Sequence, residues 1–128
     1  MVAQVQRLLR YAGFYAGAVD DDYGRLTFEA VKAYQAGQLW PTLVPDGDWG
    51  PATAGHAEWV GDLQEALNGW RTSLPRLRVD HDYGDLTFER VREWQRRNLG
   101  GAYPYYCAID GKAGPITCKA LGVPAPGR

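Results

Sequence analysis

Apolar residues near the start of the chain recur at three- and four-residue steps, the spacing that puts them on one face of a helix. They are Val2, Val5, Leu8, Leu9 and Ala12. Gly13 follows them, and glycine is favoured just after a helix because it adopts left-handed backbone angles at little cost. The pattern predicts a first helix that ends at Gly13.

Five further helices are predicted from the same kind of pattern. Proline is favoured in the first turn of a helix, which places two of the helix starts at proline residues. The predicted ranges are Leu26–Ala36, Pro51–Trp59, Leu63–Trp70, Leu86–Arg97 and Pro115–Leu121. The expected core includes the Leu, Phe and Val of two similar helices: Leu26, Phe28, Val31, Leu86, Phe88 and Val91. The fold class predicted for the chain is all-α.

A repeat explains the order of these helices. Residues 79–95 repeat residues 19–35 sixty positions later, with eleven identical residues. Shorter matches flank this block on both sides at slightly different offsets, and the insertions that these offsets require fall between helices, where loops tolerate them. One small unit has therefore been duplicated. We expect two tandem three-helix units over residues 1–60 and 61–123, with a linker or tail over residues 124–128.

Each unit contains two short turns rich in Asp and Gly, and each turn stands just before a predicted helix. The turns cover residues 20–24, 45–50, 80–84 and 110–114. In such turns an Asp side chain caps backbone N–H groups, and Gly supplies positive φ angles. Most of the repeated residues are therefore expected to maintain the architecture.

Taken as a set, the repeated residues carry a specific motif. In the first unit it comprises Val5, Gln6, Leu9, Val19, Asp20, Tyr23, Gly24, Thr27, Ala30, Val31, Tyr34, Gln35, Asp46, Gly47, Gly50, Pro51 and Thr53. In the second unit it comprises Leu63, Gln64, Leu67, Val79, Asp80, Tyr83, Gly84, Thr87, Val91, Trp94, Gln95, Ile109, Asp110, Gly111, Gly114, Pro115 and Thr117. These residues resemble the peptidoglycan-binding domain family, a three-helix module of phage endolysins and bacterial cell-wall hydrolases. The chain departs from the family at Asp21 and His81, where the family usually has Gly.

The resemblance implies non-catalytic binding of peptidoglycan, through its glycan strand, its stem peptide or both. It implies a role outside the cytoplasm, holding a covalently linked lytic or remodelling enzyme on the bacterial cell wall. Two linked modules would gain from effective concentration if both engaged one polymer. The alternative is a protein-interaction module that has kept the fold and lost the wall ligand.

Overall composition narrows the classes of partner. The net charge is −1, which argues against nucleic acid, because nucleic-acid binding needs a surplus of basic groups. No apolar run approaches the eighteen or so residues of a membrane span, so membrane insertion is not expected. The first residues lack the continuous apolar stretch of a signal peptide.

No cofactor or metal ion is expected. The chain has two histidines and no Cys-x-x-Cys pair, which leaves too few ligands for a zinc site. Its Asp-x-Asp-x-Gly turns mimic the start of a calcium loop, but the twelfth positions hold Val31 and Val91 instead of Glu. The two cysteines, Cys107 and Cys118, form either one disulfide bridge or a pair of idle thiols.

Candidate ligand-binding residues lie in and beside the turns. The pairs Asp22–Tyr23 and Asp82–Tyr83 are expected at an exposed edge before a helix N-terminus, where hydroxyls, amides and carboxylates can be bound. Thr27, Thr87, Gln35 and Gln95 either face the ligand or hold the turns from inside. Trp49 either stacks on a sugar or fills the small core. The full candidate set is Asp22, Tyr23, Thr27, Gln35, Trp49, Asp82, Tyr83, Thr87 and Gln95.

Catalysis by this chain alone is not expected. A glycosidase needs two carboxylates about 5–9 Å apart across its sugar substrate. Glu29 and Glu89 recur in the repeat, but both stand early in helices, where a negative charge suits the helix dipole. The two binding units also occupy nearly the whole chain.

Overall fold

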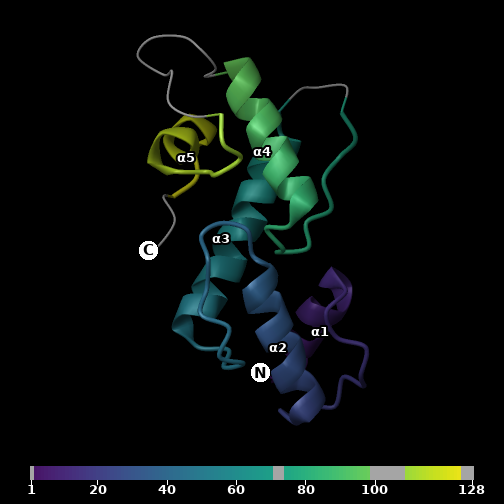
Figure 1. Cartoon of the computed structure of the whole chain (residues 1–128). Helices are drawn as coiled ribbons and strands as arrows, with labels where there is room; N and C mark the ends of the chain where they lie inside the picture. The colour runs from purple at the N-terminus through teal and green to yellow at the C-terminus, as the bar shows by residue number, and fades with distance from the viewer. Residues whose placement is uncertain (1, 71–73, 99–108, 125–128) are drawn as a thin grey trace.

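The computed structural model describes residues 2–70, 74–98 and 109–124, and every regular element in these ranges is an α-helix. The helices are α1 (Val2–Ala12), α2 (Arg25–Gly37), α3 (Pro51–Asn68), α4 (Asp85–Asn98) and α5 (Pro115–Leu121) (Figure 1). The predicted all-α fold is confirmed. Within these ranges no helix has both the length and the hydropathy required to cross a membrane.

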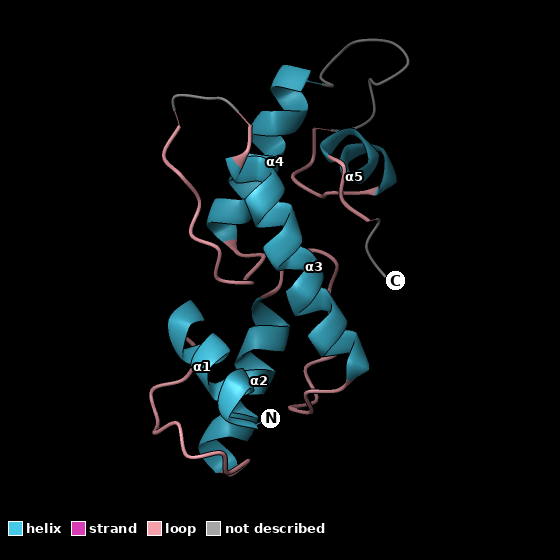
Figure 2. Ribbon diagram, turned by 180° about the vertical axis from the view of Figure 1, so that it is seen from behind, coloured by secondary structure: helices cyan, strands magenta, loops and turns pink. Residues whose placement is uncertain are grey.

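Helix α3 corrects one expectation about the helices. The two helices predicted over residues 51–59 and 63–70 are a single helix of 18 residues, Pro51–Asn68. No proline interrupts this stretch, and Val60 and Leu63 are both fully buried on the same helix. Figure 2 shows α3 running from the α1–α2 pair to α4 and α5. The first repeat (residues 1–60) and the second repeat (residues 61–123) therefore share one helix.

Two hydrophobic clusters form the core, and α3 contributes to both. The first contains Leu9, Tyr15, Ala30, Val31, Tyr34 and Ala57. The second contains Trp59, Val60, Leu63, Leu67, Leu77, Tyr83, Val91, Trp94, Ala113 and Cys118. The expected burial of Val31 and Val91 is confirmed, since both are inaccessible to solvent.

The expectation that the repeated Leu residues belong to the core is wrong. Leu26 and Leu86 are 66% and 77% exposed, because each points outward from the first turn of its helix. Phe28 is also 40% exposed. Its ring nevertheless covers Gly47, where an added Cβ would collide with it. Phe28 thus shields a turn and leaves one face in solvent.

Four buried glutamines hold the four Asp/Gly turns. We name the turns A (residues 20–24), B (46–50), C (80–84) and D (110–114). The glutamines of turns A to D are Gln6, Gln35, Gln64 and Gln95. Each Nε2 donates to the first Asp of its turn, to a backbone carbonyl two residues later and to a Thr in the following helix. Each Oε1 accepts one or two backbone N–H groups of the turn.

The second residue of every turn has a left-handed backbone. Gly47 and Gly111 have φ angles of 77° and 75°, and Asp21 and His81 both have 61°. Asp and His are among the residues that tolerate this conformation better than most. The departures from the family's Gly therefore leave the turn geometry intact.

The Asp21 and His81 side chains have different partners: α1 begins at Val2, whereas the corresponding segment of the second repeat lies within α3. Asp21 Oδ1 accepts the backbone N–H of Ala3 at 2.8 Å, and so caps the N-terminus of α1. The equivalent segment of the second repeat lies within α3 and has no free N-terminus. His81 instead places Nδ1 2.8 Å from the carbonyl oxygen of Ala57. Gly61 makes room for this ring, since a Cβ there would lie 2.5 Å from His81 Cε1.

Candidate functional site

Turns A and B of the first repeat lie next to each other. Every residue of turn A is exposed, and the exposed fraction of Tyr23 is 37%. The Tyr23 hydroxyl donates to the backbone carbonyl of Gly47 in turn B at 2.5 Å. Burial of this hydroxyl raises the pKa of Tyr23. The phenol therefore presents the rest of its ring to solvent from a fixed position.

Asp22 precedes Tyr23, and its carboxylate is exposed to solvent. Its backbone takes part in the turn, since Asp22 N donates to Asp20 Oδ1 at 3.0 Å and Asp22 O accepts Gln6 Nε2 at 3.0 Å. The Asp22 carboxylate makes no hydrogen bond or ion pair with any residue in the described ranges. The following helix, α2, starts at Arg25, and its N-cap residue Gly24 provides no side-chain cap. Asp22 and Tyr23 thus offer an acceptor and an aromatic face at one helix start, and we call this pair the turn A edge.

Turn A owes its shape to groups beneath it. Asp20 accepts a hydrogen bond from Gln6, and this bond together with backbone donors lowers the pKa of the Asp20 carboxyl. Thr27 is 1% exposed and its Oγ1 receives Gln6 Nε2 at 3.0 Å. Turn B repeats the arrangement with Gln35, which is 2% exposed and donates to Asp46. Thr27 and Gln35 therefore lie under the turns, with their polar atoms occupied inside the protein.

Turn C does not repeat the exposure of turn A. Tyr83 is 0% exposed, so the expectation that the pair Asp82–Tyr83 forms an open edge is wrong for its aromatic member. The Tyr83 ring stacks on Trp59 with a centroid distance of 6.0 Å and an interplanar angle of 12°. Its hydroxyl donates to the carbonyl of Gly111, as Tyr23 does to Gly47. The equivalent tyrosines thus share their internal hydrogen bond and differ in what covers the ring.

Residues of the first repeat and α3 cover turn C. Gln38 Oε1 accepts the backbone N–H of Tyr83, and Gln38 Nε2 donates to Asp82 Oδ1, both at 2.8 Å. The hydroxyl of Tyr34 donates to the carbonyl of His81. His56 Nε2 lies 2.9 Å from Gln38 Oε1. Burial raises the pKa of Asp82, although the Gln38 hydrogen bond partly offsets this effect.

Sequence reasoning missed the importance of Gln38, His56 and Trp59. The repeat itself contained a signal, because these residues have no counterpart of the same type in the second copy. Gln38 aligns with Asn98, and His56 and Trp59 align with Ala120 and Val123. A contact in which one copy covers the other requires residues that differ between the copies. Residue types present in only one copy are therefore candidates for such a contact.

The remaining candidates of the second repeat are also buried. Thr87 and Gln95 are 2% and 3% exposed. Thr87 Oγ1 accepts Gln64 Nε2 at 3.0 Å, and Gln95 Nε2 donates to Thr117 Oγ1 at 3.1 Å. Trp49, in the first repeat, packs against the core, and the centres of the Trp49 and Tyr34 rings are 5.5 Å apart. These positions match the interpretation in which the side chains support the turns and the core.

Cys118 is a fully buried free thiol. Its Sγ donates to the carbonyl of Ala113 at 3.0 Å, and burial raises the pKa of the thiol to about 11. Cys107, its predicted partner, lies outside the described residues, so their pairing stays a prediction. In the part of the chain that the structure describes, no group of His, Cys, Asp and Glu side chains could hold a metal ion.

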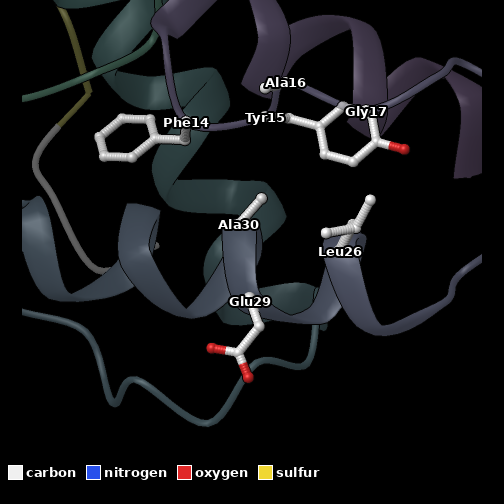
Figure 3. Close-up of a pocket in the computed structure, with 7 residues that line it drawn as sticks. All are labelled: Phe14, Tyr15, Ala16, Gly17, Leu26, Glu29 and Ala30. Carbon is white, nitrogen blue, oxygen red and sulfur yellow. The ribbon is translucent and has the colours of Figure 1, made fainter.

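A groove of about 340 Å³ lies between the loop after α1 and the first two turns of α2. Figure 3 shows Phe14 and Tyr15 on the loop side, with Ala30 and Leu26 facing them from α2. Glu29 also lines the groove, and its carboxylate points away from the loop in this view. The groove is mostly apolar and lies on the same repeat as turn A.

Comparison with known proteins gives one match. A search of the curated proteins and a search of the solved structures each returned no significant match. The family model described as "Putative peptidoglycan binding domain" matches residues 1–57, the segment that contains α1, α2, turns A and B and the start of α3. Residues 1–57 of this chain are therefore similar to the peptidoglycan-binding domain family.

Proposed function

We propose that this chain binds bacterial peptidoglycan through the turn A edge of its first repeat, without catalysing a reaction. The single observation that carries this proposal is the open position of Asp22 and Tyr23 within the segment that matches a peptidoglycan-binding family. That family is a binding domain and not a catalytic one.

The chemistry of the turn A edge suits a muropeptide, meaning a disaccharide unit of the wall with its stem peptide. A sugar ring can lie on the exposed part of the Tyr23 ring, since carbohydrate recognition combines an aromatic platform with a few hydrogen-bonding groups. The Asp22 carboxylate can accept hydrogen bonds from sugar hydroxyls or peptide N–H groups. The Gln6 network below holds both residues in place before the ligand arrives, which reduces the entropic cost of binding.

We further propose that the second repeat is a divergent copy of the module, and that the chain anchors a lytic or remodelling enzyme on the cell wall. The Gln–Asp–Thr arrangement under turns C and D supports the first part. The resemblance of the repeats to modules of phage endolysins and bacterial hydrolases supports the second. A catalytic domain linked to this chain is part of the same proposal.

A sedimentation assay on purified cell walls tests the proposed function. We expect the chain to pellet with the walls at low and moderate salt, and soluble muropeptides to release it. Wall turbidity should stay constant, because binding alone breaks no bond. A chain that stays in the supernatant at low salt would contradict wall binding and would favour a protein-interaction module instead.

A further inference from the structure

We propose that turn C of the second repeat acts as an internal ligand of the first repeat, which joins both repeats into one folding unit and leaves Asp22–Tyr23 as the one open Asp–Tyr pair among the described residues. The valency part of this proposal rests on the proposed function. The folding part does not, because it concerns contacts within the chain.

The contact between the repeats is polar and fully satisfied. Gln38 is 3% exposed and uses its amide four times: Oε1 meets Tyr83 N and His56 Nε2, and Nε2 donates to Asp82 Oδ1 and Tyr34 O. The backbone adds a further bond, since Leu39 N donates to the carbonyl of Tyr83 at 2.8 Å. A buried polar group that loses its partner destabilises a protein far more than a solvated one. Removing the Gln38 amide while the repeats stay together would therefore leave Tyr83 N and Asp82 Oδ1 without this partner.

Aromatic packing accompanies these hydrogen bonds. The ring of Trp59, itself 8% exposed, stacks on Tyr83 and lies near both His56 and Trp40, with centroid distances of 6.1 and 6.2 Å. Because Trp59 belongs to α3, the shared helix and turn C are fixed to each other. Burial of these rings stabilises the contact between the repeats in proportion to the apolar area that is removed from water.

A second contact lies at the outer side of the same junction. Arg78 Nη2 donates to the carbonyl of Tyr11 at 2.5 Å, and the guanidinium carbon lies 3.8 Å from the centre of the Tyr11 ring. Arg78 stands in the segment that leads into turn C, and Tyr11 stands in the last turn of α1. Two separate segments of the first repeat, around Tyr11 and around Gln38, therefore contact residues 78–83 of the second repeat.

The second repeat lacks the residues that would extend the same contact to a third unit. At the position of Gln38 it has Asn98, which is exposed and whose Nδ2 donates to Trp94 O at 2.9 Å. At the positions of Tyr34 and His56 it has Trp94 and Ala120. Across residues 2–70, 74–98 and 109–124 the receptor for a turn thus exists once, on the first repeat, and turn C occupies it. Turn A has no receptor within the described residues and stays open.

Urea-dependent hydrogen exchange tests the folding part. In the unmodified chain, core amides of the two repeats, such as those of Leu9 and Val91, should share one unfolding transition. The Leu39 amide should exchange only through that transition. In Gln38→Ala, Leu39 exchange should become at least about tenfold faster. Loss of one buried hydrogen-bonding network shifts the equilibrium between the closed and open states of the contact by a factor of that order.

The matched control is Asn98→Ala, which removes the equivalent amide of the second repeat and should leave Leu39 exchange unchanged. Gln38→Asn shortens the side chain and keeps the amide, so it serves if Gln38→Ala fails to fold. Separate unfolding of the repeats in the unmodified chain would overturn the proposal. So would unchanged Leu39 exchange in both Gln38 variants.

Calorimetric titration with a soluble muropeptide tests the valency part, and one equivalent per chain is expected. Two equivalents would overturn the single open Asp–Tyr pair. Absence of binding would contradict the proposed function instead, and the exchange experiment would still decide whether turn C joins the repeats.

Discussion

Tyr23 and Tyr83 occupy the same position of the repeat, yet Tyr23 is 37% exposed and Tyr83 is 0% exposed. Each hydroxyl donates to the glycine carbonyl of the neighbouring turn in its own repeat. The difference comes from Trp59 and Gln38, which cover only the second tyrosine. One duplicated residue therefore serves two purposes, a surface group in one copy and a core group in the other.

The two tyrosines should respond differently to truncation. Tyr83→Ala removes a buried aromatic ring and should lower the free energy of unfolding by about 3–5 kcal/mol. Tyr23→Ala removes a part-exposed ring with one hydrogen bond and should cost about 1–2 kcal/mol. Urea denaturation of both variants measures the difference. Equal losses in the two variants would contradict the burial of Tyr83.

The glutamine network predicts a large effect from a small change. Gln35→Leu keeps roughly the same side-chain volume but leaves the buried N–H of Gly47, which donates to Gln35 Oε1 at 2.8 Å, without an acceptor. The expected loss of stability is about 2–4 kcal/mol, because several groups lose their partner at once. Gln4→Leu is the control, since Gln4 is exposed on α1. A Gln35 variant as stable as the Gln4 variant would refute the structural role of the network.

His56 should make stability depend on pH in a defined window. Burial lowers the pKa of His56 to about 4 in the folded chain, from 6.5 when it is unperturbed. Between these values the unfolded chain binds a proton that the folded chain does not bind. Stability is therefore complete above about pH 6.5 and falls as the pH drops toward 4, by at most about 3 kcal/mol from this group.

Comparison with His56→Gln isolates this contribution. The variant has no imidazole to protonate, so its free energy of unfolding should change less between pH 7 and pH 4.5 than that of the unmodified chain. Identical pH dependence of the two proteins would show that His56 does not titrate with a lowered pKa.

Local patterns in the sequence predicted the short helices well and missed the contact between the repeats. The range expected for α5 is the observed one, and that for α2 differs by one residue at each end. These elements depend on nearby residues such as Pro115 and Gly24. The burial of Tyr83 depends on Gln38, which is 45 positions away. Periodicity within a helix carries no information about such a pair.

The candidate site was predicted in outline, and the structure narrows it. Asp22 and Tyr23 stood in the expected set and are exposed. Thr27 and Gln35 stood in the same set and lie beneath the turn. A repeated residue type does not reveal which way its side chain points when both alternatives use the same hydrogen-bonding groups. The continuous α3 was missed for a related reason, since a helix can pass through a repeat boundary that contains no helix-breaking residue.

The thiol of Cys118 should react slowly in the folded protein. Only the thiolate attacks thiol reagents, and the Cys118 pKa of about 11 leaves little thiolate at pH 8. Thiol titration of the reduced chain should therefore show Cys118 as unreactive until denaturant is added. Titration of the oxidised, denatured chain separately tests the predicted pairing with Cys107. Two free thiols in that sample would contradict the bridge.

A nuclear magnetic resonance titration of the intact chain with a soluble muropeptide tests the central claim most directly. Binding at the turn A edge should shift the amide signals of residues 20–24 and leave those of residues 80–84 nearly unchanged, because turn C is covered within the chain. Tyr23→Ala should weaken the response, whereas Leu86→Ala, an exposed change in the second repeat, should not. Shifts centred on residues 80–84, or no shift at residues 20–24 on saturation, would contradict the account.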